Sequence, residues 1–225
     1  MTVVLTNDDG IDAPGLQALA KAVNGKAVIV APQQHQSGCS HQVTTNSLIQ
    51  IERRSETAFG VAGMPADCVR IALAHLCQGV ELVLSGINAG GNLGVDAYIS
   101  GTVAAVREAS FYRVPAIAVS HYRKPNQQID WNMATRWTAD IIPKLLDLPC
   151  EPGTFWNVNL PHLKSDSPMP EMVLCHPCTQ PLPAQYRVEG DSVHYVGDYA
   201  SRDRTPGSDV DVCFSGRIAV TQIRL

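Results

Sequence analysis

The chain has 225 residues, 45% of them hydrophobic and 17% charged, a composition typical of a globular protein long enough to bury a core without metal or disulfide staples. Seventeen Lys and Arg against 21 Asp and Glu give a formal net charge of −4. Without a basic excess to neutralise a phosphate backbone, we expect no binding of nucleic-acid duplexes. No apolar run reaches the length of a membrane span, so we expect no membrane partner either.

The N-terminus and the cysteines indicate a cytoplasmic protein. Residues 1–5 are apolar but lack the basic region and cleavage site of a signal peptide, and we interpret them as a buried strand. Seven cysteines, an odd number, favour reduced thiols. Cys175 and Cys178 have the spacing of half a zinc site or of a redox pair, but no second such pair follows. We interpret them as two ordinary thiols in a loop.

Hydrophobic periodicity predicts alternating strands and helices up to residue 160. Leu16, Leu19 and Val23 recur at helical spacing after Pro14, between two short apolar runs, which is the pattern of a βαβ unit in a parallel sheet. In chain order we predict a strand at 3–5, a helix at 14–23, a strand at 27–31, a β-rich hairpin within 42–61, a helix at 65–77, a strand at 82–85, a helix at 102–111, a strand at 116–120, a helix at 131–146 and a strand at 155–160.

The remaining residues, from 161 to 225, have a different pattern. Proline is dense there and helical periodicity disappears. We predict a hairpin that pairs 185–188 with 192–196, and a final strand within 216–225. Because this segment has few large apolar residues, it would be marginal as an independent domain. We therefore predict one α/β domain over residues 1–225, with 161–225 as a β-rich extension that mediates subunit contacts.

Polar residues follow the first predicted strand at Asp8 and Asp9, within Thr-Asn-Asp-Asp-Gly. Ligands of open α/β sheets bind beyond the carboxyl ends of strands, and two adjacent carboxylates repel each other unless a cation compensates. Their hard oxygens suit Mg²⁺, Mn²⁺ or Ca²⁺. The alternative is a structural role, in which the segment forms an Asx turn and a helix cap with Gly10 at positive φ.

Two further predicted strand ends also carry oxygen donors. Ser37 lies in the loop after the second, and Asn88 begins a glycine-rich loop after the strand at 82–85. Ser100-Gly101-Thr102 then opens a helix, which offers amides and hydroxyls to a phosphate or serves only as a helix cap. The glycines match no dinucleotide fingerprint, P-loop or nucleophile elbow. Together, these donors favour metal-assisted hydrolysis of a phosphate ester.

The same stretches resemble the SurE family, the survival protein E type of 5'/3'-nucleotidases. The matching segments are LTNDDGIDAPG at 5–15, VAP at 30–32 with SG at 37–38, GMPADCVR at 63–70, LSGIN at 84–88 with GNLG at 91–94, SGTV at 100–103, VPAIAVS at 114–120 and DVD at 209–211. The resemblance implies a Rossmann-like, mostly parallel sheet flanked by helices, a β-rich extension, and a homodimer or homotetramer. It also implies a nucleoside monophosphate substrate and one divalent ion per subunit, Mg, Mn or Co.

By position, the resemblance assigns the metal ligands to Asp8, Asp9, Ser37 and Asn88, and the phosphate contacts to Asn92, Ser100, Gly101 and Thr102. Asp8 and Asp9 are the expected catalytic residues, with Asp9 the better candidate to orient or deprotonate the attacking water. The loop before Ser37 departs from the family, because Gln33-Gln34-His35-Gln36 stands where charged residues are usual. A non-catalytic nucleotide- or phosphate-binding module on the same fold is the alternative.

Overall fold

Strand β1 (Thr2–Thr6) lies inside a large sheet in the computed structural model, which describes residues 1–24 and 27–225. In this described part, nine strands form the sheet in the order β3 (Ile51–Arg53), β4 (Ala58–Val61), β2 (Val28–Pro32), β1, β5 (Val80–Asn88), β6 (Ala116–His121), β7 (Thr154–Leu160), β11 (Ile218–Arg224) and β8 (Met172–Leu174). The strands from β4 to β7 pair in parallel, whereas β3 runs antiparallel to β4 and β11 antiparallel to β7.

The strand order reverses next to β1. The chain proceeds outward from β1 to β2 and β4, and then returns to place β5 on the opposite side of β1. The loops that leave the carboxyl ends of β1 and β5 therefore diverge. In open α/β sheets this topological switch point is where ligands bind.

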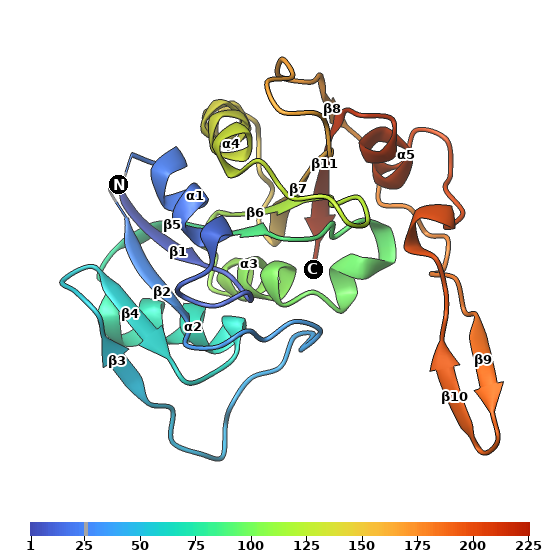
Figure 1. Ribbon diagram of the computed structural model, residues 1–225. Helices are drawn as coiled ribbons and strands as arrows, with labels where there is room; N and C mark the ends of the chain where they lie inside the picture. The colour runs from blue at the N-terminus through green and yellow to red at the C-terminus, as the bar shows by residue number, and fades with distance from the viewer. Residues whose placement is uncertain (25–26) are drawn as a thin grey trace.

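Helices cover both faces of the sheet, as Figure 1 shows. Successive side chains of β1 point to opposite faces, so Val3 and Leu5 join one apolar core and Val4 the other. The first core contains residues of α1 (Pro14–Ala22) and α4 (Trp131–Leu146), and the second contains residues of α2 (Pro65–Ile71) and α3 (Gly101–Phe111). A helix-sheet-helix sandwich results. None of the described helices has the length and apolar character that crossing a bilayer requires.

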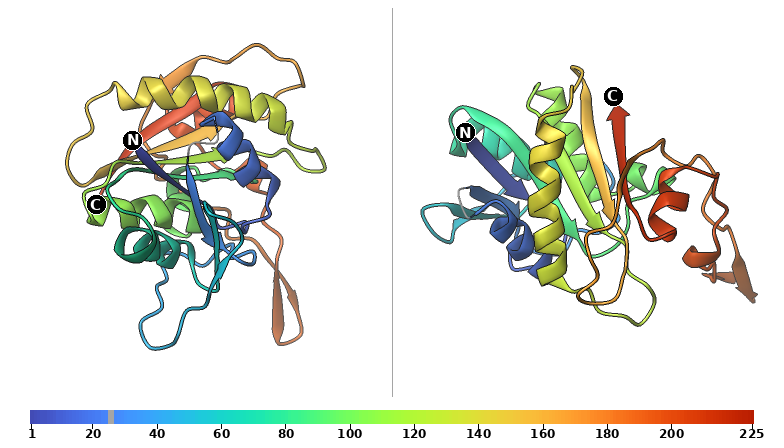
Figure 2. Two further views of the ribbon diagram at one scale, coloured as in Figure 1. Left: turned by 90° about the vertical axis from the view of Figure 1, so that its left-hand side faces the viewer. Right: turned by 90° about the horizontal axis from the view of Figure 1, so that it is seen from above.

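The segment after β7 forms the outer part of the molecule. Strands β9 (Tyr186–Glu189) and β10 (Ser192–Tyr195) make a separate two-stranded hairpin, which stands away from the main sheet in Figure 1 and in both views of Figure 2. Helix α5 (Asp209–Phe214) precedes β11 and buries Val210, Val212 and Cys213 in a third cluster with Leu93 of the β5–α3 loop.

The predicted α/β fold and its mostly parallel sheet are confirmed, and the predicted strands and helices occur with bounds shifted by a few residues. The predicted helix at 65–77 is α2 followed by a π-helical turn, Ala72–Leu76. The hairpin predicted within 42–61 is confined to β3 and β4. No helix was predicted after residue 160, so α5 was missed. Helix α5 has six residues, too few to show a hydrophobic period, and tertiary packing stabilises it.

Candidate active site

The loop after β1 contains part of the structural alternative for the adjacent aspartates. Asn7 makes the turn, since its Nδ2 donates to the Gly10 carbonyl at 2.8 Å and its Oδ1 accepts the Gly10 N–H at 3.3 Å, with Gly10 at φ +105°. Helix α1 begins after Ala13 without a side-chain cap. The Asx turn of the structural alternative is therefore present, and Asn7 forms it. The side-chain helix cap of that alternative is absent. Neither feature uses the carboxylates of Asp8 and Asp9.

Asp8 is only 4% exposed, at the carboxyl end of β1. Burial raises the pKa of its carboxyl group to about 6, the neighbouring Asp9 carboxylate adds to the rise, and the Thr102 hydroxyl, which donates to Asp8 Oδ1, opposes it. A buried carboxylate beside a second carboxylate is costly to ionise, and a nearby positive charge lowers that cost. The local chemistry thus favours a cation at Asp8.

Asp9 joins two loops at the topological switch point. Its Oδ2 accepts the Ala89 N–H at 3.1 Å, and its Oδ1 lies 3.3 Å from Nδ1 of His35, whose side chain is 61% exposed. His35 is a contact that the sequence did not predict, because its spacing from Asp9 matches no motif. The carboxylate is held between the loops that follow β2 and β5.

A cavity of about 550 Å³ opens at the carboxyl ends of β1 and β5. Five of the eight site residues predicted from the sequence line it, namely Asp8, Ser37, Asn88, Asn92 and Ser100. No described residue lining this cavity is Lys, Arg or His. A phosphate dianion placed beside Asp8 would therefore meet no side-chain cation, which is a second reason for a bound metal ion.

The neutral oxygens near Asp8 suit the same cation. Asn88 uses its Nδ2 to donate to the Gly90 carbonyl at 2.8 Å, so its Oδ1 remains available as a ligand. The Gln36 N–H donates to the Asp8 carbonyl at 2.7 Å, which holds the loop carrying Ser37 against the end of β1.

A cation at Asp8 would be bound by oxygen atoms only. The described residues contain no group of three or more His, Cys, Asp and Glu side chains positioned to hold a metal. A cation here would have two carboxylates, with a hydroxyl and an amide oxygen. Such a donor set fits a hard divalent ion better than zinc.

The N-terminus of α3 lies directly against Asp8. Ser100 caps the helix, because its Oγ accepts the Val103 N–H at 3.1 Å. A Cβ at Gly101 would lie 2.8 Å from Asp8 Cβ and 2.9 Å from Cys39 Sγ, so only glycine permits this approach. The first N–H groups of a helix have no intrahelical partner and attract anions. Ser100 can therefore cap the helix while the remaining N–H groups of its first turn bind an anion, so the two roles expected at residues 100–102 are compatible.

Asn92 is positioned by buried polar side chains from β6 and β7. Asn159 Oδ1 accepts the Asn92 N–H at 2.8 Å, and Asn157 and Asn159 donate to the Asn92 carbonyl at 2.9 and 3.1 Å. Ser120 Oγ accepts from Asn92 Nδ2 at 2.8 Å. These partners were missed from the sequence, although two asparagines at alternate positions of an otherwise mostly apolar strand were a usable signal.

Cys175 and Cys178 do not act together. Cys175 Sγ lies 3.7 Å from the Val220 carbonyl and Cys178 Sγ lies 4.0 Å from the Asp203 carbonyl, and both thiols are free. The interpretation as two ordinary thiols agrees with this arrangement.

Comparison with known proteins matches the sequence to the family described as Survival protein SurE, over residues 3–181. The chain belongs to the SurE family. A relative from Nostoc sp., described as a "putative 5'-nucleotidase", is 62% identical over the full length of both chains. A "5'-nucleotidase SurE" from Xanthomonas axonopodis pv. citri is 34% identical over this whole chain and 90% of the relative. The crystal structure of the SurE protein from Aquifex aeolicus superimposes with a TM-score of 0.88 at 28% identity, covering 100% of this chain and 93% of that one.

Proposed function

We propose that this SurE chain is a divalent-metal-dependent phosphatase that hydrolyses nucleoside 5'- or 3'-monophosphates to nucleoside and phosphate. The observation that carries the proposal is the buried Asp8 carboxylate, against the N-terminus of α3 and in a cavity whose described lining contains no basic side chain. The names of the relatives, which describe 5'-nucleotidases, support the choice of substrate.

Asp8, Asp9, Ser37 and Asn88 would hold one divalent ion, Mg, Mn or Co. When bound, such an ion neutralises phosphoryl oxygens and lowers the pKa of a coordinated water. Asp8 is fixed by the Thr102 hydroxyl, and Asp9 by the Ala89 N–H. Asp9 is the less buried of the two aspartates and is the group we expect to orient or deprotonate the attacking water.

The phosphate contacts in this proposal come from the loop after β5 and from the start of α3. Asn92 and Ser100 line the cavity, and Gly101 supplies a main-chain N–H at the positive end of the helix. Thr102 is fully buried, and its hydroxyl is occupied by Asp8. Its contribution to phosphate binding would therefore come from its N–H group.

The proposal extends to the whole molecule. We infer a single domain over residues 1–225, a homodimer or homotetramer built with the 161–225 extension, and a cytoplasmic location. The hairpin supports the oligomer, because Val188 and Val193 pair on one of its faces and are 71% and 64% exposed.

Phosphate release from a panel of nucleoside 5'- and 3'-monophosphates, with Mg²⁺, Mn²⁺ or EDTA, tests the function. We expect turnover that requires metal and disappears in Asp9→Asn, since an amide still accepts the Ala89 N–H but supplies no charge. Asp12→Asn, at an exposed position three residues further along the chain, is the matched control and should retain turnover.

Turnover in EDTA, or full activity of Asp9→Asn, would contradict the proposal. Nucleotide binding without release of phosphate under any metal would identify the non-catalytic module instead. The altered loop from Gln33 to Gln36 would then be the first segment to examine.

A further inference from the structure

The cavity at the end of β1 has two chemically different sides. One side carries Asp8 and the other oxygen donors, together with the N-terminus of α3. The other side is formed by residues that enter, form and leave the β9–β10 hairpin. They are Leu182, Pro183, Ala184, Tyr186, Tyr195, Gly197 and Tyr199. A nucleoside monophosphate has the same division, with a charged phosphate at one end and a flat ring at the other.

Tyr186 and Tyr195 form a pair at the base of the hairpin. They are directly opposite each other in the β9–β10 register, and their ring centroids lie 5.5 Å apart in a T-shaped arrangement. Within a single chain Tyr186 is 57% exposed and Tyr195 is 47% exposed, so both rings have surface that no other residue of the chain covers. A Cβ at Gly197 would lie 2.4 Å from Tyr195 Oη, which shows that the Tyr195 ring folds back onto this glycine.

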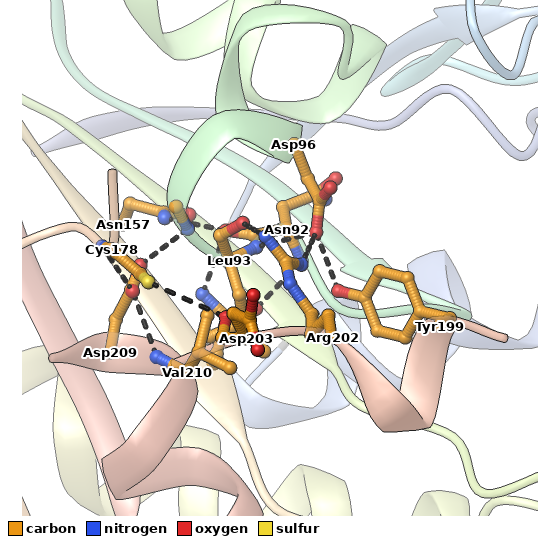
Figure 3. A network of polar contacts seen from close by, with 12 residues as sticks. Asn92, Leu93, Asp96, Asn157, Cys178, Tyr199, Arg202, Asp203, Asp209 and Val210 are labelled. Carbon is orange, nitrogen blue, oxygen red and sulfur yellow. Dashed lines mark hydrogen bonds and ion pairs between the residues drawn. The ribbon is translucent and has the colours of Figure 1, made fainter. Parts of the chain in front are cut away.

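The incoming end of this segment is tied to the loop after β5. The carboxylate of Asp209 accepts the Cys178 N–H at 2.7 Å (Figure 3). It also accepts the Gly94 N–H at 2.6 Å. Gly94 also approaches the main chain of Cys178 so closely that a Cβ would lie 2.4 Å from the Cys178 carbonyl oxygen. Residue 178 is thus fixed against the loop that also carries Asn88 and Asn92.

The outgoing end is tied to the same loop. Arg202, whose side chain is fully buried, donates to Asp96 Oδ2 at 2.7 Å, and Tyr199 donates its hydroxyl to the same oxygen (Figure 3). The guanidinium of Arg202 also lies over the Tyr199 ring, 5.0 Å from its centroid. Both ends of the segment that carries the tyrosines are thus tied to the loop after β5, and the tyrosines line the same cavity as Asp8 within a single chain.

We propose that Tyr186 and Tyr195 form a nucleoside-binding wall, against which the base of the substrate stacks while its phosphate lies at the Asp8 end. This assignment rests on the function proposed above. The cavity volume of about 550 Å³ is in the range of sites that enclose small ligands. Aromatic stacking is tolerant of the base, because every base has a π-face, so the wall accepts purine and pyrimidine nucleotides alike.

Steady-state kinetics of Tyr186→Ala and Tyr195→Ala, with adenosine 5'-monophosphate as substrate and inorganic phosphate as product inhibitor, test the wall. Each truncation should raise KM for the nucleotide about tenfold, the effect of removing one stacking partner, and leave the inhibition constant of phosphate within about twofold. Tyr186→Phe and Tyr195→Phe keep the ring and should keep the wild-type KM.

Two controls separate the wall from other effects. Tyr112→Ala removes a tyrosine of similar exposure, 53%, that does not line the cavity, and should leave KM unchanged. Val188→Ala alters the hairpin at a residue that does not line the cavity. Sedimentation of all variants at assay concentration reports whether the association of subunits has changed.

The outcomes distinguish the wall from the proposed function. Two results overturn the wall but not the proposed function. One is hydrolysis with an unchanged KM in both alanine variants. The other is an equal rise in KM for the nucleotide and in the inhibition constant of phosphate. If the wild type does not hydrolyse the nucleotide, calorimetric titration with adenosine 5'-monophosphate and Mg²⁺ decides. Binding that both alanine variants weaken supports the wall without the activity, whereas unaffected or absent binding overturns the wall as well.

Discussion

At the scale of single residues, Asp8 carries the largest electrostatic cost in this site. Its carboxyl group has a pKa of about 6 in the folded protein, raised by burial from an ordinary value of 3.8. Ionisation is therefore easier in the unfolded chain, and the folded state loses stability as the pH rises from about 4 to about 6. A shift of about two units corresponds to about 3 kcal/mol.

Asp8→Asn should consequently stabilise the metal-free protein. In EDTA above pH 6 we expect its free energy of unfolding to exceed that of the wild type by up to about 3 kcal/mol, and the two to converge near pH 4. Urea unfolding at several pH values measures this difference. Equal stability of the two proteins at pH 8 would show that the Asp8 carboxylate is not destabilised by burial.

At the scale of secondary-structure elements, the contact between α3 and the end of β1 sets the geometry of the site. Gly101 lets the first turn of the helix lie against Asp8, and the Cβ of an alanine there would be 2.8 Å from Asp8 Cβ. Cys39 Sγ can rotate away from this atom, but Asp8 Cβ moves only with the backbone. Helix and strand must then separate, although alanine is the better helix former.

Gly101→Ala should therefore lower kcat/KM by at least about 100-fold with the fold retained, because displacements of about 1 Å at reacting groups have effects of this size. Nucleotide hydrolysis measures the loss of kcat/KM, and the circular dichroism spectrum shows whether the fold is retained. Gly90→Ala is the control, since a Cβ there meets only Asn88 Nδ2, at an ordinary 3.6 Å. Equal activity of the two variants would contradict the steric argument.

At the scale of the whole molecule, the ion pair of Arg202 with Asp96 connects the C-terminal segment to the loop after β5. The Arg202 side chain is 0% exposed and that of Asp96 is 9% exposed. Removing one partner of a buried pair leaves an uncompensated charge, and the loss is typically about 3–5 kcal/mol. The pair spans 106 positions of sequence, so it holds together parts of the chain that local structure does not.

Arg202→Met should lower the free energy of unfolding by about 3 kcal/mol, and the double variant with Asp96→Asn should recover part of the loss. Urea unfolding of the wild type, the two single variants and the double variant gives the double-mutant cycle. Arg187→Met is the matched control, because its partner Glu189 lies at 2.7 Å but both side chains are about 60% exposed; we expect less than about 1 kcal/mol there. A similar loss in both single variants would contradict the role of burial.

The sequence by itself determined the order of strands and helices up to residue 160 and the polar residues that follow them. Hydrophobic period and turn residues are properties of neighbours along the chain, so the positions of β1, α1 and α4 could be predicted. The run around Asp8 and Asp9 could also be recognised, because the spacing of a loop motif is local. The metal and phosphate roles of these residues remain predictions.

The tertiary structure alone decided which side chains meet. Asn159 positions Asn92 across 67 residues, and Tyr186 reaches the cavity from a hairpin almost 100 positions beyond Asn88, contacts that no local pattern encodes. Helix α5 was likewise missed because its six residues are stabilised by distant partners such as Leu93. Local propensity fixes the elements, but the pairing of strands and the burial of their side chains build the site.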